Sequence, residues 1–175
     1  MTYTIRDIPA LSFTFAERYL GGRSWRPIAN NTEIGAVTVR NTPTGSWGGY
    51  TLRLHSTNIL TVTGPEDDPG RFLFVDTGGW NSVTTFQRLN QCLPSAVWSY
   101  DSEGIFRGHG YYVAVGATRG VSHIRGHDYD TGRSWSTPLQ RVCVIDTHTG
   151  RPTYGSLVGD ASVNLFTTDR PNKGN

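Results

Sequence analysis

The sequence predicts a single α+β domain over residues 1–175, a strand-rich antiparallel sheet with one principal helix near residues 84–93. Three observations support this fold class. A chain of 175 residues has the length of one domain. Its 21 glycines and 9 prolines indicate many tight turns between short elements. Several segments alternate apolar and polar residues as strands do, whereas one segment has a clear helical pattern.

The N-terminal part of the chain has the weaker patterns. The segment TYTIRDI (residues 2–8) is typical of a first strand, and SFTFAERYLGG (12–22) predicts a short helix or strand that ends at the glycine pair. RSWRPIANN (23–31) is basic and predicts a loop. AVTVRNT (36–42) alternates cleanly, which predicts a strand, and PTGSW (43–47) supplies the following turn.

The clearest strand pattern lies at residues 50–64, where leucine, isoleucine and valine recur among polar residues. The turn GPEDDPG (64–70) separates it from a second strand, RFLFVDTGG. Residues 50–76 therefore predict an antiparallel hairpin, and His55 is expected inside its first strand.

The predicted helix follows this hairpin. Thr84 begins an S/T-x-x-E/Q capping box, apolar side chains then recur at helical spacing, and Pro94 ends the pattern. This spacing places Arg88 and Asn90 away from the apolar face of the helix.

Two further strands are expected, at AVWSY (96–100) and YYVAV (111–115), which completes a core over about residues 26–116. Residues 117–134 are polar and rich in glycine, and they predict a long loop that is functional or mobile.

The C-terminal part predicts one more hairpin, with its turn near Thr149 and Gly150. Residues 167–175 are expected to form a frayed tail. The chain contains no internal repeat, low-complexity tract or linker, which supports one domain rather than two.

Charge and cysteine content narrow the function classes. A net charge of +2 permits an anionic partner, but the dense basic stripe of a dedicated duplex-DNA binder is absent. The two cysteines, Cys92 and Cys143, form no CxxC pair, so neither a disulfide scaffold nor a cysteine-based zinc site is expected. The sequence has no signal-peptide pattern and no apolar run of membrane-spanning length, so a soluble intracellular protein is expected, with no membrane partner.

The segment DTGGWNSVTTFQRLNQ (76–91) carries the candidate binding site. A glycine pair allows close backbone approach, and a helix N-terminus with hydroxyl side chains and an arginine can hold a phosphate. The same residues also suit a purely structural strand-to-helix corner, in which the hydroxyls cap the helix. The candidate ligand-binding residues are His55, Gly79, Trp80, Ser82, Thr84, Thr85, Arg88, Asn90 and His109.

Other histidines offer less complete patterns. His109 lies between glycines, where it suits an exposed acid, base or phosphate donor, or only a turn. His123 and His127, in HIRGHDYD, have the spacing of helix-borne zinc ligands. A glycine interrupts them and the glutamate of HExxH is missing, so no metal site is expected, and no cofactor either.

No complete catalytic set can be assembled, so no catalytic residue is assigned and a binding protein is favoured over an enzyme. The GxSxG, GxxxxGK[ST] and GxGxxG motifs are absent. His55 and His109 invite comparison with a two-histidine phosphodiesterase, but the repeated H-x-[ST] motif of such enzymes is not present.

Three segments, RPIANNT, LRLHSTNILTV and DTGGWNSVTTFQRLN, resemble a group of small bacteriophage proteins. Members of that group share an LH-x-[ST]-x-I strand, a G-W-x-[ST]-x-T-T segment and an R-[LIM]-N helix. The resemblance covers about residues 26–113. It implies a viral origin, hence the host cytoplasm as location, and a compact strand–strand–helix–strand unit.

Four functional hypotheses follow. The first is a phage accessory protein that binds a phosphate-bearing nucleotide and thereby sequesters a nucleotide messenger of host immunity. The second is a nucleic-acid-binding accessory protein, since basic and aromatic residues interleave in RSWRP and GHGYYV. The third is a phosphodiesterase or nuclease that uses His55 or His109, and the fourth is an inhibitor that binds a host protein. The oligomeric state stays open.

Overall fold

A computed structural model of the protein describes residues 7–42, 44–93, 97–100, 106–109, 111–139, 142–153 and 166–167. The predicted strand at residues 2–8 and the predicted tail at 167–175 fall almost entirely outside these residues. The elements are α1 (Phe13–Leu20), β1 (Trp25–Ala29), β2 (Thr32–Thr42), β3 (Gly45–Leu54), β4 (Thr57–Thr63), β5 (Phe72–Val75), α2 (Val83–Cys92), β6 (Val97–Tyr100), β7 (Phe106–His109), β8 (Tyr111–Thr118), β9 (Val121–Asp128), β10 (Arg133–Pro138), β11 (Cys143–Asp146), β12 (Arg151–Pro152) and β13 (Phe166–Thr167).

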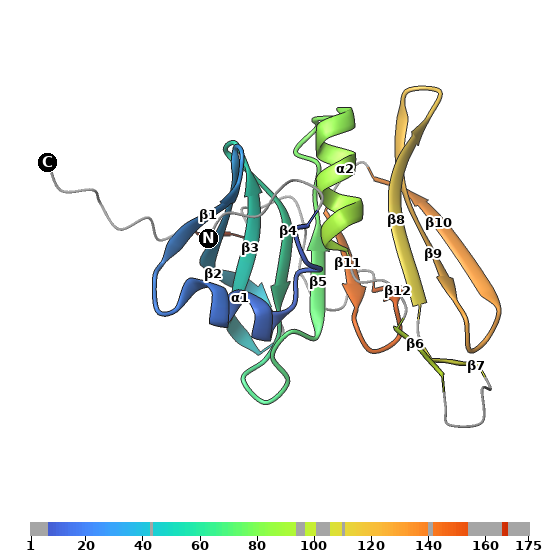
Figure 1. Cartoon of the computed structure of the whole chain (residues 1–175), viewed down its shortest axis with the longest axis horizontal. Helices are drawn as coiled ribbons and strands as arrows, with labels where there is room; N and C mark the ends of the chain where they lie inside the picture. Colours follow the sequence, from blue (N-terminus) through green and yellow to red (C-terminus); the bar gives the residue numbers. More distant parts are fainter. Residues whose placement is uncertain are drawn as a thin grey trace, which may run out of the picture.

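The strands form one large antiparallel sheet and two small ones (Figure 1). The large sheet has the order β1-β2-β3-β4-β5-β11-β12, with β13 paired to β2. A three-stranded sheet has the order β10-β9-β8, and β6 pairs with β7. The strand-rich α+β fold class predicted from the sequence is confirmed, with a second short helix, α1, in addition to the principal one.

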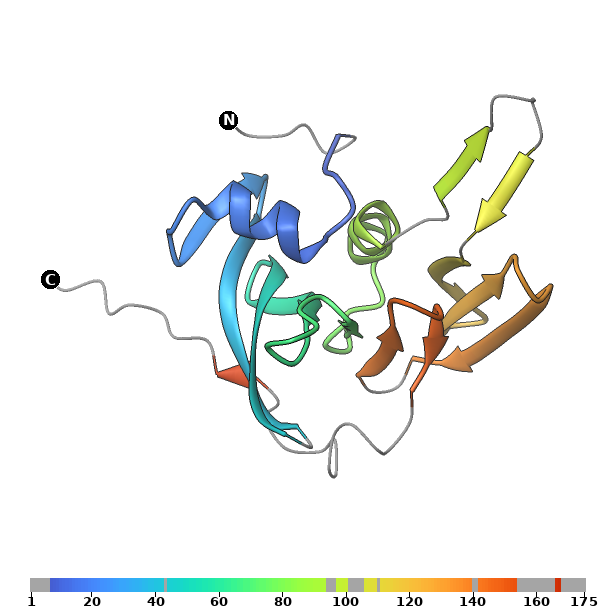
Figure 2. The same cartoon turned by 90° about the horizontal axis from the view of Figure 1, so that it is seen from below.

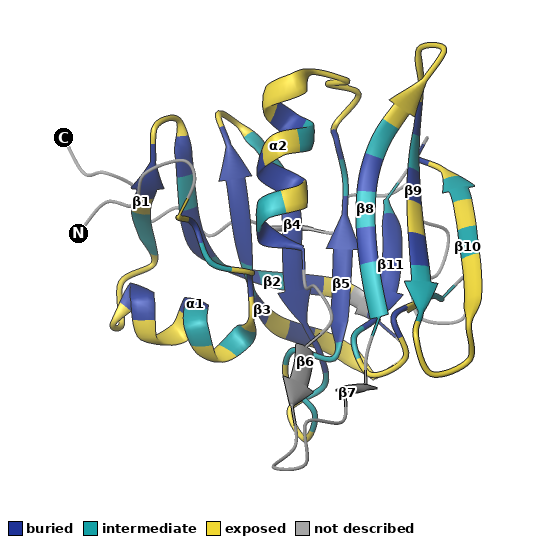
Figure 3. Ribbon diagram, turned by 45° about the vertical axis from the view of Figure 1, so that its right-hand side comes forward, coloured by how far each residue is buried: buried dark blue, intermediate teal, exposed yellow. Residues whose placement is uncertain are grey.

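Both helices lie on the same side of the large sheet (Figure 2). Helix α1 packs against β2 and β3, whereas α2 packs against β4 on one side and β8 on the other (Figure 3). Leu89 and Cys92 of α2 are fully buried in the main hydrophobic core. Helix α2 therefore joins the large sheet to the three-stranded sheet. Neither helix is long and apolar enough to cross a membrane.

Two sequence predictions about strands are wrong. Residues 23–31 are not a loop, because they contain β1. Residues 50–64 are not one strand, because β3 and β4 pair with each other and Leu54 lies opposite Thr57. His55 and Ser56 form the turn between these two strands. The predicted hairpins at β4–β5 and β11–β12, and the strands near 97–100 and 111–115, are confirmed.

The prediction of a long polar loop at residues 117–134 is also wrong, because β9 and β10 occupy most of it. The inward positions of β9 are Ser122, Ile124 and Gly126, and two of these three carry no apolar side chain. The indole of Trp135 lies against the backbone of Gly126, where a Cβ would overlap the ring. An aromatic ring from the neighbouring strand thus supplies the apolar cover that the glycine lacks.

The two thiols are buried, and burial raises the pKa of Cys92 and of Cys143 to about 12. We expect iodoacetamide to leave both thiols unmodified in the folded protein at about pH 8 and to modify both after unfolding in urea, because the thiolate is the reactive form. The contribution of the two thiols to the free energy of unfolding should be constant below about pH 9, the ordinary range of a thiol, and fall as the pH rises towards 12.

Stability falls with rising pH because burial raises the thiol pKa values in the folded protein, so the unfolded chain releases its thiol protons at a lower pH than the folded chain does. Mass spectrometry of the labelled protein measures the reaction, and Cys92→Ser and Cys143→Ser variants assign each label. Rapid labelling of the folded protein at either thiol would contradict this prediction.

Candidate functional site

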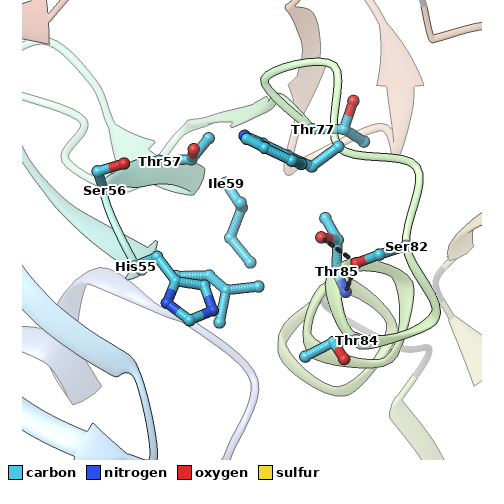
Figure 4. Close-up of a pocket in the computed structure, with 10 residues that line it drawn as sticks. His55, Ser56, Thr57, Ile59, Thr77, Ser82, Thr84 and Thr85 are labelled. Atoms are coloured by element: carbon cyan, nitrogen blue, oxygen red, sulfur yellow. Dashed lines mark hydrogen bonds between the residues drawn. The ribbon is translucent and has the colours of Figure 1, made fainter.

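A pocket of about 400 Å³ opens at the N-terminal end of α2. Its walls come from the β3–β4 turn, the loop that follows β5, and the first turn of α2. In Figure 4 the side chains of His55 and Thr57 lie across the pocket from Ser82 and Thr84, with Ile59 between them. The lining residues are Leu54, His55, Ser56, Thr57, Ile59, Thr77, Trp80, Ser82, Thr84 and Thr85.

His55 reaches the pocket because it occupies the β3–β4 turn. Its φ of 54° is in the left-handed region, which a two-residue turn between twisted strands favours. Its backbone N–H donates to the carbonyl of Asn31 at 2.8 Å, so the turn is held against the neighbouring β1–β2 connection. The sequence prediction placed His55 inside a strand, where its side chain would have had neighbouring strands on both sides.

The loop after β5 is held by two local contacts. The Asp76 carboxylate accepts the N–H of Gly78 at 2.8 Å. Gly78 has a φ of 58°, and a Cβ there would lie 2.6 Å from Cγ2 of Thr57. This close approach requires glycine, and it fixes the distance between the loop and the β3–β4 turn. Trp80 follows on the same loop with 67% of its surface exposed.

Helix α2 begins two residues earlier than the predicted capping box. Ser82 is the N-cap, and its hydroxyl oxygen accepts the N–H of Thr85 at 3.2 Å. The Ser82 and Thr85 hydroxyls also share a hydrogen bond of 2.9 Å. The helix itself provides no acceptor for the N–H groups of Val83 and Thr84, which lie at its positive end.

Arg88 differs most from its predicted setting. It is only 3% exposed, although the sequence placed it away from the apolar face. Its Nε donates to the hydroxyl of Thr32 at 3.0 Å, so the large sheet gives the guanidinium a polar contact inside the protein. Arg88 is one helical turn beyond Thr84 and Thr85, and Thr32 is the strand partner of Leu54. The guanidinium therefore lies beneath the pocket rather than on its wall.

The charge of Arg88 has no carboxylate partner in the part of the chain that the structure describes, where Thr32 is its hydrogen-bond partner. Arg53, the other arginine that is buried among the described residues, pairs with Glu33 at 2.8 Å and stacks on Trp25. Arg88 also acts on Cys92, where its positive charge opposes the rise in pKa that burial causes.

Three predicted residues lie elsewhere. The Asn90 amide binds both backbone groups of Val115, at 2.8 and 2.9 Å, and so joins α2 to β8. Gly79 lines an adjacent hollow beside Val121. His109 ends β7, and its side chain lies outside the described part of the structure.

The pocket thus brings together five of the predicted residues: His55, Trp80, Ser82, Thr84 and Thr85. Sequence reasoning missed the apolar residues Leu54 and Ile59 and the hydroxyl residues Ser56, Thr57 and Thr77. The H-x-[ST] pattern after Leu54 was a usable signal for the hydroxyls, because a polar cluster inside an apolar run indicates a turn.

Residues 123–128 of the HIRGHDYD segment lie in β9, so His123 and His127 lie on one face of a strand rather than on a helix. No group of three metal-ligating side chains occurs among the residues of known placement. Asp128, on the opposite face, binds Arg151 at 2.9 Å. Hydrogen bonds from Thr131 and Arg151 hold the pKa of Asp128 at about 2.

The fold and site define a strand-rich α+β protein with an open pocket at one helix N-terminus. Residues 18–136 match the family model of the Kyanoviridae Gp96 protein, from within α1 to within β10. This match spans more than half of the chain and includes every residue that lines the pocket. No curated protein and no solved structure matches the chain. The chain therefore belongs to the Kyanoviridae Gp96 family of bacteriophage proteins.

Proposed function

We propose that the pocket binds a nucleotide, with the base against Trp80 and a phosphate at the N-terminal end of α2. The observation that carries this proposal is the buried charge of Arg88 beneath the pocket. Buried charges are normally paired, because an isolated ion inside a protein costs several kcal/mol. Among the described residues Arg88 has no carboxylate partner, and a phosphate in the pocket would supply a negative charge.

Two sources make the pocket electropositive. The first is Arg88, whose buried charge attracts an anion more strongly than an exposed charge does, because the effective dielectric constant inside a protein is lower than that of water. The second is the helix terminus, where the N–H groups of Val83 and Thr84 point out of the first turn. Among the described lining residues no carboxylate opposes them.

The rest of the pocket suits a nucleoside. Trp80 is exposed and lines the opening, so its indole is available for stacking, which contributes about 1–3 kcal/mol per base. Leu54 and Ile59 provide an apolar floor, and the surrounding hydroxyls can donate to or accept from a ribose. A volume of about 400 Å³ is within the range of small-molecule sites.

Binding without cleavage is the favoured activity. His55 is the one titratable side chain among the described residues of the pocket wall, so a base, an acid and a nucleophile cannot be assigned together. In a bacteriophage protein, retention of an intact nucleotide fits the sequestering of a nucleotide messenger of host immunity. This role would make the protein an anti-defence factor.

Calorimetry and tryptophan fluorescence with mononucleotides, ADP-ribose and cyclic dinucleotides test the proposal. We expect saturable binding that perturbs the fluorescence of Trp80, and an affinity about tenfold lower for Trp80→Ala. Val83→Ala is the matched control, because Val83 is 72% exposed beside the site but does not line it. No binding of any of these ligands, or equal losses in both variants, would refute the proposal.

A second experiment distinguishes binding from turnover. The purified protein is incubated with lysate of infected cells, re-isolated and denatured, and the released small molecules are identified by mass spectrometry. An intact nucleotide is expected. A recovered cleavage product would instead indicate a phosphodiesterase.

A further inference from the structure

The three-stranded sheet has an outer face that the pocket does not use. We define this outer face by Tyr112 of β8, by His123, Arg125 and His127 of β9, and by Ser134 and Ser136 of β10. Strand alternation directs Val113, Val115 and Ile124 to the buried side. In register, Tyr112, His127 and Ser134 lie side by side, and Arg125 lies next to Ser136.

The outer face carries basic, aromatic and hydroxyl side chains without acidic ones. It combines an aromatic ring, two imidazoles, a guanidinium and two hydroxyls, and none of the three strands places a carboxylate on it. The nearest strand carboxylate, Asp128, faces the other way and is bound to Arg151. A solvent-facing sheet surface is ordinarily polar, but a mixture of both charge signs is the usual composition.

The outer face also contains a shallow depression, and one of its imidazoles is held by neighbouring side chains. A depression of about 570 Å³ is lined by Tyr112, Arg125, Gly126, His127, Ser134, Trp135 and Ser136. The Nδ1 atom of His127 is 2.8 Å from the Ser134 hydroxyl, and its ring centroid lies 4.9 Å from that of Tyr129 in a T-shaped arrangement. These two contacts hold the imidazole in place before any ligand arrives, which reduces the entropy lost on binding.

We propose that the outer face binds single-stranded nucleic acid. Bases would stack on Tyr112 and His127, and a phosphate would lie against the exposed guanidinium of Arg125. Neighbouring strands are about 4.8 Å apart and alternate residues about 6.8 Å, so the rings and the guanidinium are within the reach of one or two nucleotides. The single arginine is too little charge for duplex binding, whereas stacking suits unpaired bases.

This proposal is tested by fluorescence anisotropy with labelled single strands of DNA and RNA of about 12 nucleotides, from about 50 to about 200 mM salt. We expect binding that weakens with salt. Tyr112→Ala should lower the affinity about tenfold, and Arg125→Ser about fivefold with a flatter salt dependence. Trp80→Ala should leave this affinity unchanged, because Trp80 lines the other site.

Arg133→Ser is the matched control, since it removes the same charge from the opposite face of the sheet, in register with Asp128. Its affinity should stay within about twofold of the parent. Circular dichroism should show all variants folded, because the substituted side chains are exposed or half-buried. No binding at low salt, or equal losses for Arg125→Ser and Arg133→Ser, would overturn the proposal.

Discussion

An Arg88→Met variant should unfold at the same temperature as the parent protein or at a higher one, and should bind the nucleotide ligand at least about tenfold more weakly. Methionine keeps the length of the side chain and its apolar contacts, and it removes a buried charge that has Thr32 as its partner among the described residues. Replacement of buried charge by apolar side chains is often neutral or stabilising. The same substitution removes most of the positive potential beneath the pocket.

Thermal unfolding and calorimetry of the same preparation measure both effects. Arg53→Met is the matched control, because Arg53 is equally buried but is paired with Glu33 and stacked on Trp25. That variant should lose about 2 kcal/mol of stability and keep its nucleotide affinity. If Arg88→Met were the variant that lost stability while nucleotide affinity was kept, Arg88 would be a structural residue.

Gly150→Ala should destabilise the fold by about 3 kcal/mol, a large share of the stability of an ordinary domain. Gly150 has a φ of 64°, so an alanine there is strained by about 1 kcal/mol. In addition, its Cβ would overlap Cβ and Cγ of Tyr111. These atoms are next to the Tyr111 backbone, so the ring cannot move aside unless β8 moves with it.

Gly120→Ala separates the two contributions. Gly120 has a φ of 78°, but a Cβ there would meet no atom within 4 Å. Its cost should therefore be backbone strain alone, about 1 kcal/mol. Urea denaturation of both variants gives the comparison. Equal losses would show that the Tyr111 ring moves freely and that this contact is not a constraint.

Sequence patterns predicted those helices and strands whose apolar residues recur at helical or alternating spacing. Helix α2 was found because Phe86, Leu89 and Leu93 follow a helical period, but its start was placed at Thr84 rather than Ser82. Both residues are good N-caps, but Ser82 is the one in use, because its hydroxyl accepts the N–H of Thr85 and Thr84 lies inside the helix. Strand β9 was missed because its inward positions include Ser122 and Gly126, which only a neighbouring strand can cover.

The part of the candidate site that is formed by neighbours in the sequence was predictable, whereas the part that depends on contacts between distant residues was not. The hydroxyls and Trp80 follow one another in the chain, so their grouping was visible in the sequence. The burial of Arg88 depends on Thr32, which is 56 residues away, and the position of Asn90 depends on Val115. Side chains on the polar face of a predicted helix become buried when a second sheet packs there, and α2 has a sheet on each side.

In the described part of the chain, three aromatic rings occupy the place where a glycine Cβ would be: Trp25 at Gly35, Trp135 at Gly126 and Tyr111 at Gly150. Substitutions at a ring position and at its glycine position therefore depend on each other. A larger residue at the glycine position is tolerated only after the ring has been replaced by a small side chain. Loss of the ring alone leaves the glycine backbone without its apolar cover. Related phage sequences should therefore change at both positions of a pair or at neither, and single exchanges should be rare.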